Sequence, residues 1–171
     1  MGDVETLMEP QPRRLSEQER TQIVEIAAST RAILEGLVDL SGYRAGLSGS
    51  KVSGACLYAS ILVQISLEKF ASCRAQIRGG SGESSMGIRC DDGVWRGHYW
   101  VEGLSKSGAH FLCDITADQF GLEQVVVWDA SRSWDRYRSE APDLVDRDVA
   151  AALREMAGER RLAEKGKTNG D

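Results

Sequence analysis

Apolar residues recur at helical intervals in the first half of the chain. Ser16 and Glu19 match a capping box, in which the serine hydroxyl accepts from a backbone N–H three residues on and the glutamate reaches back. Apolar residues three and four positions apart follow and predict a helix over about 17–38, at Ile23, Ile26, Ala27, Ala28, Ile33, Leu34, Leu37 and Val38. A Gly/Ser-rich loop over 41–54 precedes a second helix, predicted to start near Gly54 or Ala55 and to end near Phe70. Because this helix is apolar around most of its circumference, we expect it to be central to the fold.

The periodicity changes after Phe70, where alternating residues and turn signals predict short strands. The predicted strands cover 73–78, 87–90, 93–104, 109–116 and 124–128. The turn SKSG joins two of them into a hairpin, and a charged amphipathic helix is predicted over 146–163. Helices followed by an antiparallel run of strands and a last helix are typical of an α+β fold, with the helices segregated from the sheet.

Length and composition narrow the class of protein. The 171 residues fit one domain over 15–164, between flexible segments 1–14 and 165–171. The formal charge, 21 − 26 = −5, argues against non-specific nucleic-acid binding, which needs basic surface. No apolar run approaches the roughly 20 residues of a membrane span, and the acidic N-terminus lacks an apolar signal core. These features predict a cytoplasmic protein without membrane contact, although specialised secretion would leave no such trace.

Three residues form a pattern suited to nucleophilic chemistry. Cys56 lies in the first turn of the second predicted helix, where the partial positive charge favours a thiolate and the N–H groups can stabilise an oxyanion. His98 lies in the strand over 93–104, and Asp114 lies in the strand over 109–116. A hairpin can place a carboxylate beside an imidazole, so these residues suit the roles of nucleophile, base and orienting acid.

Other residues compete for the same roles. His110 shares strand parity with Asp114, and Asp118 lies just beyond it, where it can instead satisfy turn backbone groups. Cys73, Cys90 and Cys113 lie in strand-like segments, which favours structural burial, and Cys113 should face away from Asp114. With no Cys-x-x-Cys pair, the four cysteines are expected to be free thiols. The aromatic and basic segment 132–138 is either a solvated loop or a contact for a partner or an acidic substrate.

The motifs GACLYAS, HYWVE and LCDITADQF resemble the transglutaminase-like branch of the papain-like cysteine hydrolases over roughly residues 54–121. The resemblance implies a central helix carrying Cys56, packed on an antiparallel sheet carrying His98 and Asp114. The glutamine that many papain-like enzymes place before the cysteine is missing here. Backbone N–H groups near Ala55 and Cys56, or a side chain such as Ser50 or Lys51, would then form the oxyanion site. Gln119 and Trp100 are further candidates for lining the site. The alternative for Gln119 is turn capping, and a tryptophan such as Trp100 is more often part of the core than a platform for substrate.

Two classes of function follow. The first is a cysteine-dependent hydrolase or acyltransferase that acts on an amide or thioester of a protein or peptide substrate, by peptidase, deamidase or transglutaminase-like chemistry, without a cofactor. The second is a non-enzymatic binding module, such as an effector, inhibitor or adaptor, that keeps the fold. A zinc site formed by Cys56, His98 and Asp114 is a third reading, which no ligand pair at helical spacing supports.

Overall fold

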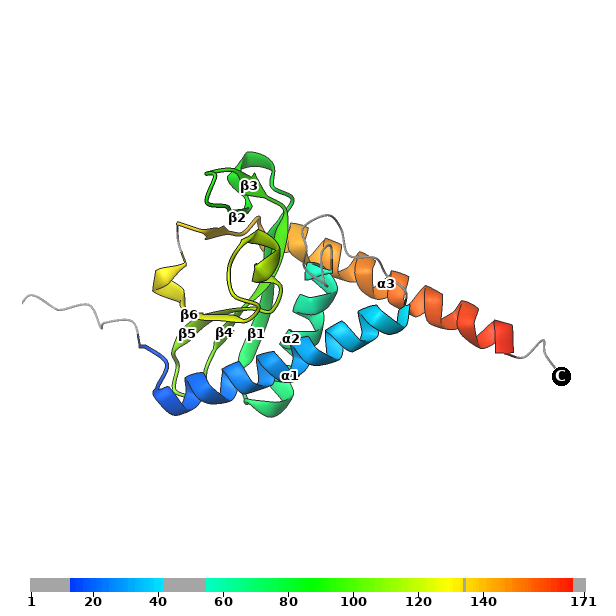
Figure 1. The fold of residues 1–171 in the computed structure, drawn as a ribbon, viewed down its shortest axis with the longest axis horizontal. Coiled ribbons are helices and arrows are strands. Elements are labelled where there is room, and N and C mark those ends of the chain that lie inside the picture. The colour runs from blue at the N-terminus through cyan, green and yellow to red at the C-terminus, as the bar shows by residue number, and fades with distance from the viewer. Residues whose placement is uncertain (1–12, 42–54, 134, 168–171) are drawn as a thin grey trace, which may run out of the picture.

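A computed structural model describes residues 13–41, 55–133 and 135–167 (Figure 1). Three helices and two antiparallel sheets make up this part of the chain, which confirms the α+β class. The helices are α1 (Glu17–Ser41), α2 (Cys56–Phe70) and α3 (Pro142–Lys167). The larger sheet has the order β1-β4-β5-β6, with β1 at Arg74–Gly80, β4 at His98–Leu104, β5 at His110–Asp114 and β6 at Val126–Asp129. The smaller sheet has the order β3-β2-β7, with β2 at Gly87–Arg89, β3 at Trp95–Arg96 and β7 at Tyr137–Arg138.

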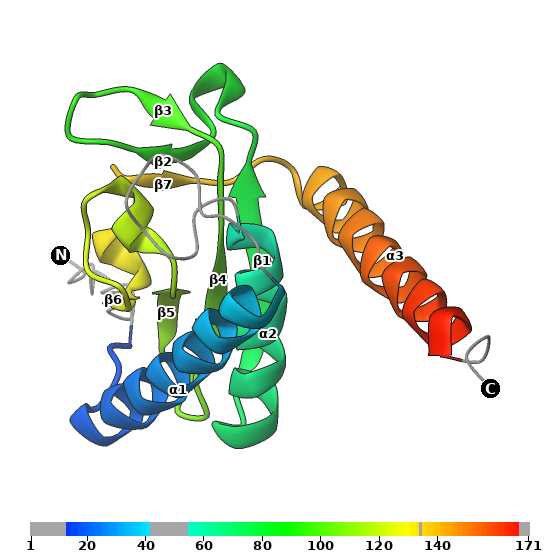
Figure 2. The same cartoon turned by 45° about the vertical axis from the view of Figure 1, so that its right-hand side comes forward.

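Helices α1 and α2 pack on one face of the larger sheet, and the smaller sheet lies beyond one end of it (Figure 2). Residues that alternate along β4 and β5 therefore face two different cores. Val101, Phe111 and Cys113 pack towards the helices, whereas Trp100 and Leu112 pack on the other face with residues of the smaller sheet. Cys113 accordingly faces away from Asp114, as its strand parity predicts.

The capping box at the start of α1 is confirmed. The Glu19 backbone N–H donates to the Ser16 hydroxyl at 3.2 Å, and the Ser16 backbone N–H donates to the Glu19 carboxylate at 3.1 Å. The same carboxylate accepts from the backbone N–H and hydroxyl of Ser107, in the turn between β4 and β5. Hydrogen bonds from Ser16 and Ser107 lower the pKa of Glu19 to about 2. One side chain thus closes the helix end and ties it to the hairpin.

The predicted strand over 93–104 is wrong in one respect, because the chain breaks at Gly97 into β3 and β4. A Cβ at Gly97 would lie 2.8 Å from the carbonyl oxygen of Ser81, so the backbones approach too closely there for a side chain. The strand β3 belongs to the smaller sheet and β4 to the larger one. His98, the first residue of β4, therefore lies where the chain passes from one sheet to the other.

The last quarter of the chain also differs from the prediction. Helix α3 begins at Pro142 rather than near residue 146, and it continues to Lys167. Proline is well suited to the first turn of a helix, where its missing N–H needs no partner. Within the segment 132–138, Tyr137 and Arg138 form β7, and Tyr137 is buried, so a fully solvated loop is the wrong interpretation.

Helix α2 is central only in part. Ala59, Ile61, Val63 and Leu67 are buried against α1 and the sheet, but Ile65 and Phe70 are more than half exposed. Within the described residues, no helix has the length and apolar character that a membrane span requires.

Candidate active site

His98 and Asp114 form a buried pair at one end of the larger sheet. His98 begins β4 and Asp114 ends β5, and because these strands are antiparallel the two residues come together. The Nε2 atom of His98 lies 2.6 Å from Oδ2 of Asp114, and the two side chains are 0% and 1% exposed. A short, solvent-excluded ion pair of this kind fixes the orientation of the imidazole ring, as a catalytic histidine requires.

Asp114 is held by donors on both of its oxygens. Its Oδ1 atom accepts from the Thr116 backbone N–H at 2.9 Å and from the Thr116 hydroxyl at 3.3 Å. Its Oδ2 atom accepts from the Tyr137 hydroxyl at 3.0 Å as well as from His98. The carboxylate therefore has its charge compensated although it is buried.

Aromatic rings enclose the pair. The Phe120 ring meets the His98 ring edge-on at 4.7 Å between centroids, and the Trp100 ring lies stacked at 6.2 Å. The Tyr137 ring meets Trp100 at 5.1 Å. These rings exclude water, which strengthens the attraction between imidazole and carboxylate.

Cys56 is the first residue of α2 and is half-buried. Burial by itself lowers the pKa of His98, but Asp114, and after it the Cys56 thiol, outweigh burial and raise the pKa to about 9. Nδ1, the other ring nitrogen, is buried and has no hydrogen-bond partner among the described residues. The thiol is thus close enough to act on the imidazole electrostatically. Nδ1 is the ring nitrogen that remains available to accept a hydrogen bond from it.

Tyr99 connects helix α3 to the candidate site. The Tyr99 hydroxyl donates to Asp148 of α3 at 2.7 Å. Burial, Asp148 and Cys56 together raise the pKa of Tyr99, so the phenol stays protonated beside the thiol. The candidate site therefore draws on α2, α3 and both sheets.

The raised pKa of His98 predicts a stability that falls in alkali. Folding raises this pKa from 6.5 to about 9, so the stabilisation is complete below pH 6.5 and is lost as the pH rises towards 9. The full effect is about 3 kcal/mol. Urea unfolding at pH 6, 7 and 8 measures most of it, below about pH 8.5, where the thiols of the unfolded chain begin to ionise. His110→Gln, which removes the exposed histidine, should leave the profile unchanged, and a flat profile in the wild-type chain would contradict the assignment.

The competing residues lie elsewhere or serve other purposes. His110 is exposed and begins β5, at the opposite end from Asp114. Asp118 makes a two-pronged ion pair with Arg31 of α1, at 2.8 and 2.9 Å. Cys73 and Cys113 are buried, and burial raises the pKa of both thiols, that of Cys73 to about 11. Cys90 is only half-buried and accepts from Arg96 at 3.2 Å, so full burial is the wrong prediction for it.

The residues expected to line the site are placed as follows. Ser50 and Lys51 lie outside the described residues. Ala55 is the buried residue that precedes α2, where its carbonyl accepts from the Ala59 N–H. The side-chain amide of Gln119 donates to the carbonyl of Thr116 at 3.2 Å, as in the turn-capping alternative. Trp100 is 1% exposed and packs in the core, so it offers no surface to a substrate.

Sequence reasoning missed Tyr137, Thr116 and Phe120 as members of the site. Tyr137 lies in a two-residue strand, which is too short to show alternation. Thr116 and Phe120 follow β5 in the motif DITADQF, and the short 3-10 helix at Ala117–Phe120 brings the phenyl ring over His98. The motif was thus a usable signal for Thr116 and Phe120, whereas the aromatic and basic segment 132–138 gave no sign that Tyr137 would lie beside His98.

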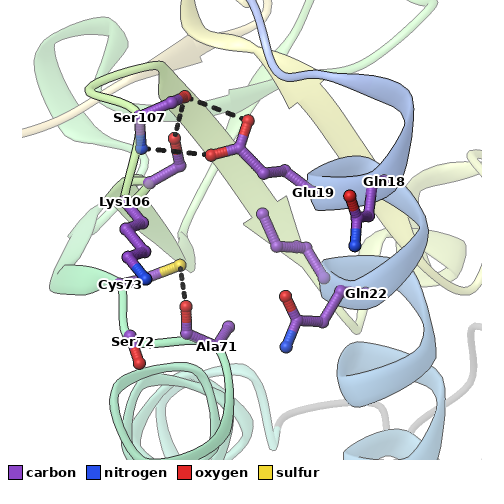
Figure 3. A pocket seen from close by; sticks show the side chains of 10 residues that line it. Gln18, Glu19, Gln22, Ala71, Ser72, Cys73, Lys106 and Ser107 are labelled. Atoms are coloured by element: carbon purple, nitrogen blue, oxygen red, sulfur yellow. Dashed lines mark hydrogen bonds between the residues drawn. The ribbon is translucent and has the colours of Figure 1, made fainter.

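A cavity of about 470 Å³ lies near the other end of α2 (Figure 3). Its walls come from α1, from the turn after α2 and from the turn between β4 and β5, including Glu19, Cys73 and Lys106. Cys56 begins α2 and this cavity is beside its end, about 20 Å away for a helix of 15 residues. The cavity is therefore separate from the candidate active site.

Within the described ranges, no three His, Cys, Asp or Glu residues are grouped so as to hold a metal ion. The chain matches no protein-family model, and no curated protein or solved structure matches it. The candidate site thus depends on its own geometry.

Proposed function

We propose that this protein is a cysteine-dependent hydrolase or acyltransferase, with Cys56 as nucleophile, His98 as general base and acid, and Asp114 as the residue that orients His98. Its substrate is an amide or thioester of a protein or peptide. The observation that carries the proposal is that the two ring nitrogens of His98 have different surroundings. Nε2 is bound to a buried carboxylate, while Nδ1 has no other described partner and Cys56 raises the pKa of the ring.

The reaction divides into two displacements. The Cys56 thiol passes its proton to Nδ1 of His98, and the sulfur attacks the carbonyl carbon of the substrate. The bond to the leaving group then breaks, and the leaving group takes the proton from His98, which leaves an acyl group on the sulfur as a thioester. Water or an amine attacks the carbonyl carbon of this thioester, and His98 accepts the proton of the incoming nucleophile. The bond between the acyl carbon and the sulfur then breaks, the acid or amide product leaves, and His98 returns the proton to the sulfur. Asp114 stays ionised and stabilises the imidazolium.

The start of α2 is suited to the developing negative charge on the carbonyl oxygen. The first backbone N–H groups of a helix have no acceptor within the helix, and the helix dipole adds partial positive charge there. These groups belong to the turn that contains Cys56, so they lie next to the proposed nucleophile. We propose them as the oxyanion site.

The order of elements supports a papain-like or transglutaminase-like fold as part of the same proposal. Cys56 begins a helix packed against an antiparallel sheet, and neighbouring strands of this sheet carry His98 and Asp114. This arrangement is what the resemblance of the three sequence motifs leads one to expect.

Alkylation by iodoacetamide, followed by peptide mapping, tests the proposal without knowledge of the substrate. Near neutral pH we expect Cys56 to react at least about tenfold faster in the wild-type chain than in His98→Gln, because a neighbouring imidazolium favours the thiolate. Cys90, the other half-buried thiol, accepts a hydrogen bond from Arg96 and should react at the same rate in both chains, and Cys56→Ala should remove the fast phase. An equal rate at Cys56 in the wild-type chain and in His98→Gln would refute the triad and leave a binding module with the same fold.

A second measurement separates the reaction types. A glutamine-containing peptide is incubated with the protein, with and without a primary amine, and followed by mass spectrometry. Cleavage of the peptide indicates a peptidase, a gain of about one mass unit with release of ammonia indicates a deamidase, and attachment of the amine indicates acyl transfer. Cys56→Ala is the control for each product.

A further inference from the structure

The Tyr137 hydroxyl and the His98 imidazole share one oxygen of Asp114. Tyr137 donates to Oδ2 at 3.0 Å, and Nε2 of His98 lies 2.6 Å from the same atom. The other oxygen is occupied by the backbone N–H and the hydroxyl of Thr116. Removing Tyr137 would thus leave His98 as the sole described partner of Oδ2.

The position of Tyr137 is fixed by its surroundings. Its strand β7 pairs with β2, where Tyr137 lies opposite the buried Ile88. Its ring packs edge-on against Trp100 at 5.1 Å and against Trp128 at 5.9 Å. A phenol held this firmly delivers its O–H to a defined point.

The phenol remains a donor across the working range of pH. Burial and the charge of Asp114 raise the pKa of Tyr137 well above its ordinary value. Arg136 acts in the opposite direction and Cys113 in the same one, and neither cancels the effect. Among the described residues, the titratable groups that act most strongly on His98 are Asp114 and Cys56, and the Trp100 and Phe120 rings lie beside its imidazole.

We propose that Tyr137 is a positioning residue of the candidate triad, which anchors Oδ2 of Asp114 and limits how strongly that oxygen binds the proton on His98. This inference rests on the proposed function. A second donor on Oδ2 shares the negative charge of the carboxylate and thereby weakens its pull on the imidazolium. His98 then retains enough acidity to return its proton to the leaving group. Tyr137 acts through Asp114 and touches neither the thiol nor the substrate.

The test is the Nε2–H proton resonance of His98 in the full chain at neutral pH. The chain has two histidines, so His110, which is exposed, serves as an internal reference. In Tyr137→Phe we expect the His98 signal to move downfield and its titration midpoint to rise, while His110 stays unchanged. Ser133→Ala is the matched control, since it removes one buried hydroxyl bond, to the Ala130 carbonyl, from the same segment without touching Asp114. A His98 signal at the same position in wild type and Tyr137→Phe overturns the proposal.

Fluorotyrosine provides the opposite change without altering the shape of the side chain. Replacing the four tyrosines by 3-fluorotyrosine makes each phenol a stronger donor, so the His98 signal should move upfield. The same labelling of Tyr137→Phe fluorinates only the other three tyrosines and should give no shift. If Tyr137→Phe does not fold, the labelled wild-type chain decides the question alone, because an unmoved signal then refutes the proposal.

Turnover of p-nitrophenyl acetate gives the kinetic counterpart. Tyr137→Phe should reduce kcat about tenfold with little change in KM, and should shift the alkaline limb of the rate profile upwards. Because the resonance is measured without a substrate, it tests the role of Tyr137 independently of the hydrolase proposal. An inactive wild type with a shifted resonance defeats the hydrolase proposal alone, and an active wild type with an unmoved resonance defeats the role of Tyr137 alone.

Discussion

Asp114→Asn lowers the turnover of an activated ester such as p-nitrophenyl acetate by about 10³-fold to 10⁴-fold, with the fold retained. Asparagine has the shape of aspartate and can still accept from the Thr116 N–H through its one oxygen. Its amide group then faces Nε2 of His98, which has to become an acceptor. The ring proton moves to Nδ1, the nitrogen that should take the proton of Cys56. The base is thus present, but in the wrong tautomer.

A neighbouring aspartate provides the control for this substitution. Asp129 on β6 accepts from Arg20 at 3.0 Å and from the Leu15 N–H at 3.2 Å, and its strand pairs with β5. Asp129→Asn removes a carboxylate of the same sheet, paired with an arginine, without reaching His98. It should leave turnover unchanged, and equal losses in the two variants would show that charge in the sheet, rather than the bracing of His98, matters.

Arg31→Met should destabilise the protein by about 3 kcal/mol, because it removes a buried guanidinium from partly buried carboxylates and from the buried Ile115 carbonyl. The Arg31 side chain is 4% exposed. It donates to both oxygens of Asp118, to Glu35 and, at 2.6 Å, to the Ile115 carbonyl. These contacts fasten the segment that follows Asp114 to helix α1. We therefore expect lower turnover as well as a lower urea midpoint.

Arg20→Met is a closely matched comparison. Arg20 lies three turns earlier on the same helix and makes the same kind of contacts, to the Val127 carbonyl and to Asp129. Its side chain, however, is 37% exposed, so water replaces much of what is lost. The expected cost is about 1 kcal/mol or less. A similar midpoint shift in both variants would mean that burial of Arg31 adds nothing to the strength of its ion pair.

The sequence predicts those parts of the site that depend on a local pattern within one element, such as the alternation of residues along a strand. Alternating residues around His98 and Asp114 indicate two strands, and the turn between them indicates a hairpin. Antiparallel pairing then brings the start of one strand to the end of the next. The capping box is similarly local, since its two residues lie three positions apart.

The parts that remained hidden depend on contacts between distant segments. Arginine is usually exposed, and the partner that allows Arg31 to be buried lies 87 positions further along the chain. Alternation continues through Gly97, so the passage from one sheet to the other leaves no mark in the pattern. Tyr137 is defined by its pairing with β2, which its own neighbours in the sequence do not specify.

Asp114 is contacted by His98 of the larger sheet and by Tyr137 of the smaller sheet, and this has a consequence during synthesis of the chain. Cys56 leaves the ribosome early, whereas Tyr137, the last of the four side chains, follows only after most of the domain has been made. Until β7 joins β2, the carboxylate lacks one of its donors and the ring that covers His98 on that side is missing. A chain that ends before residue 137 therefore lacks part of the enclosure that the folded domain builds around His98 and Asp114.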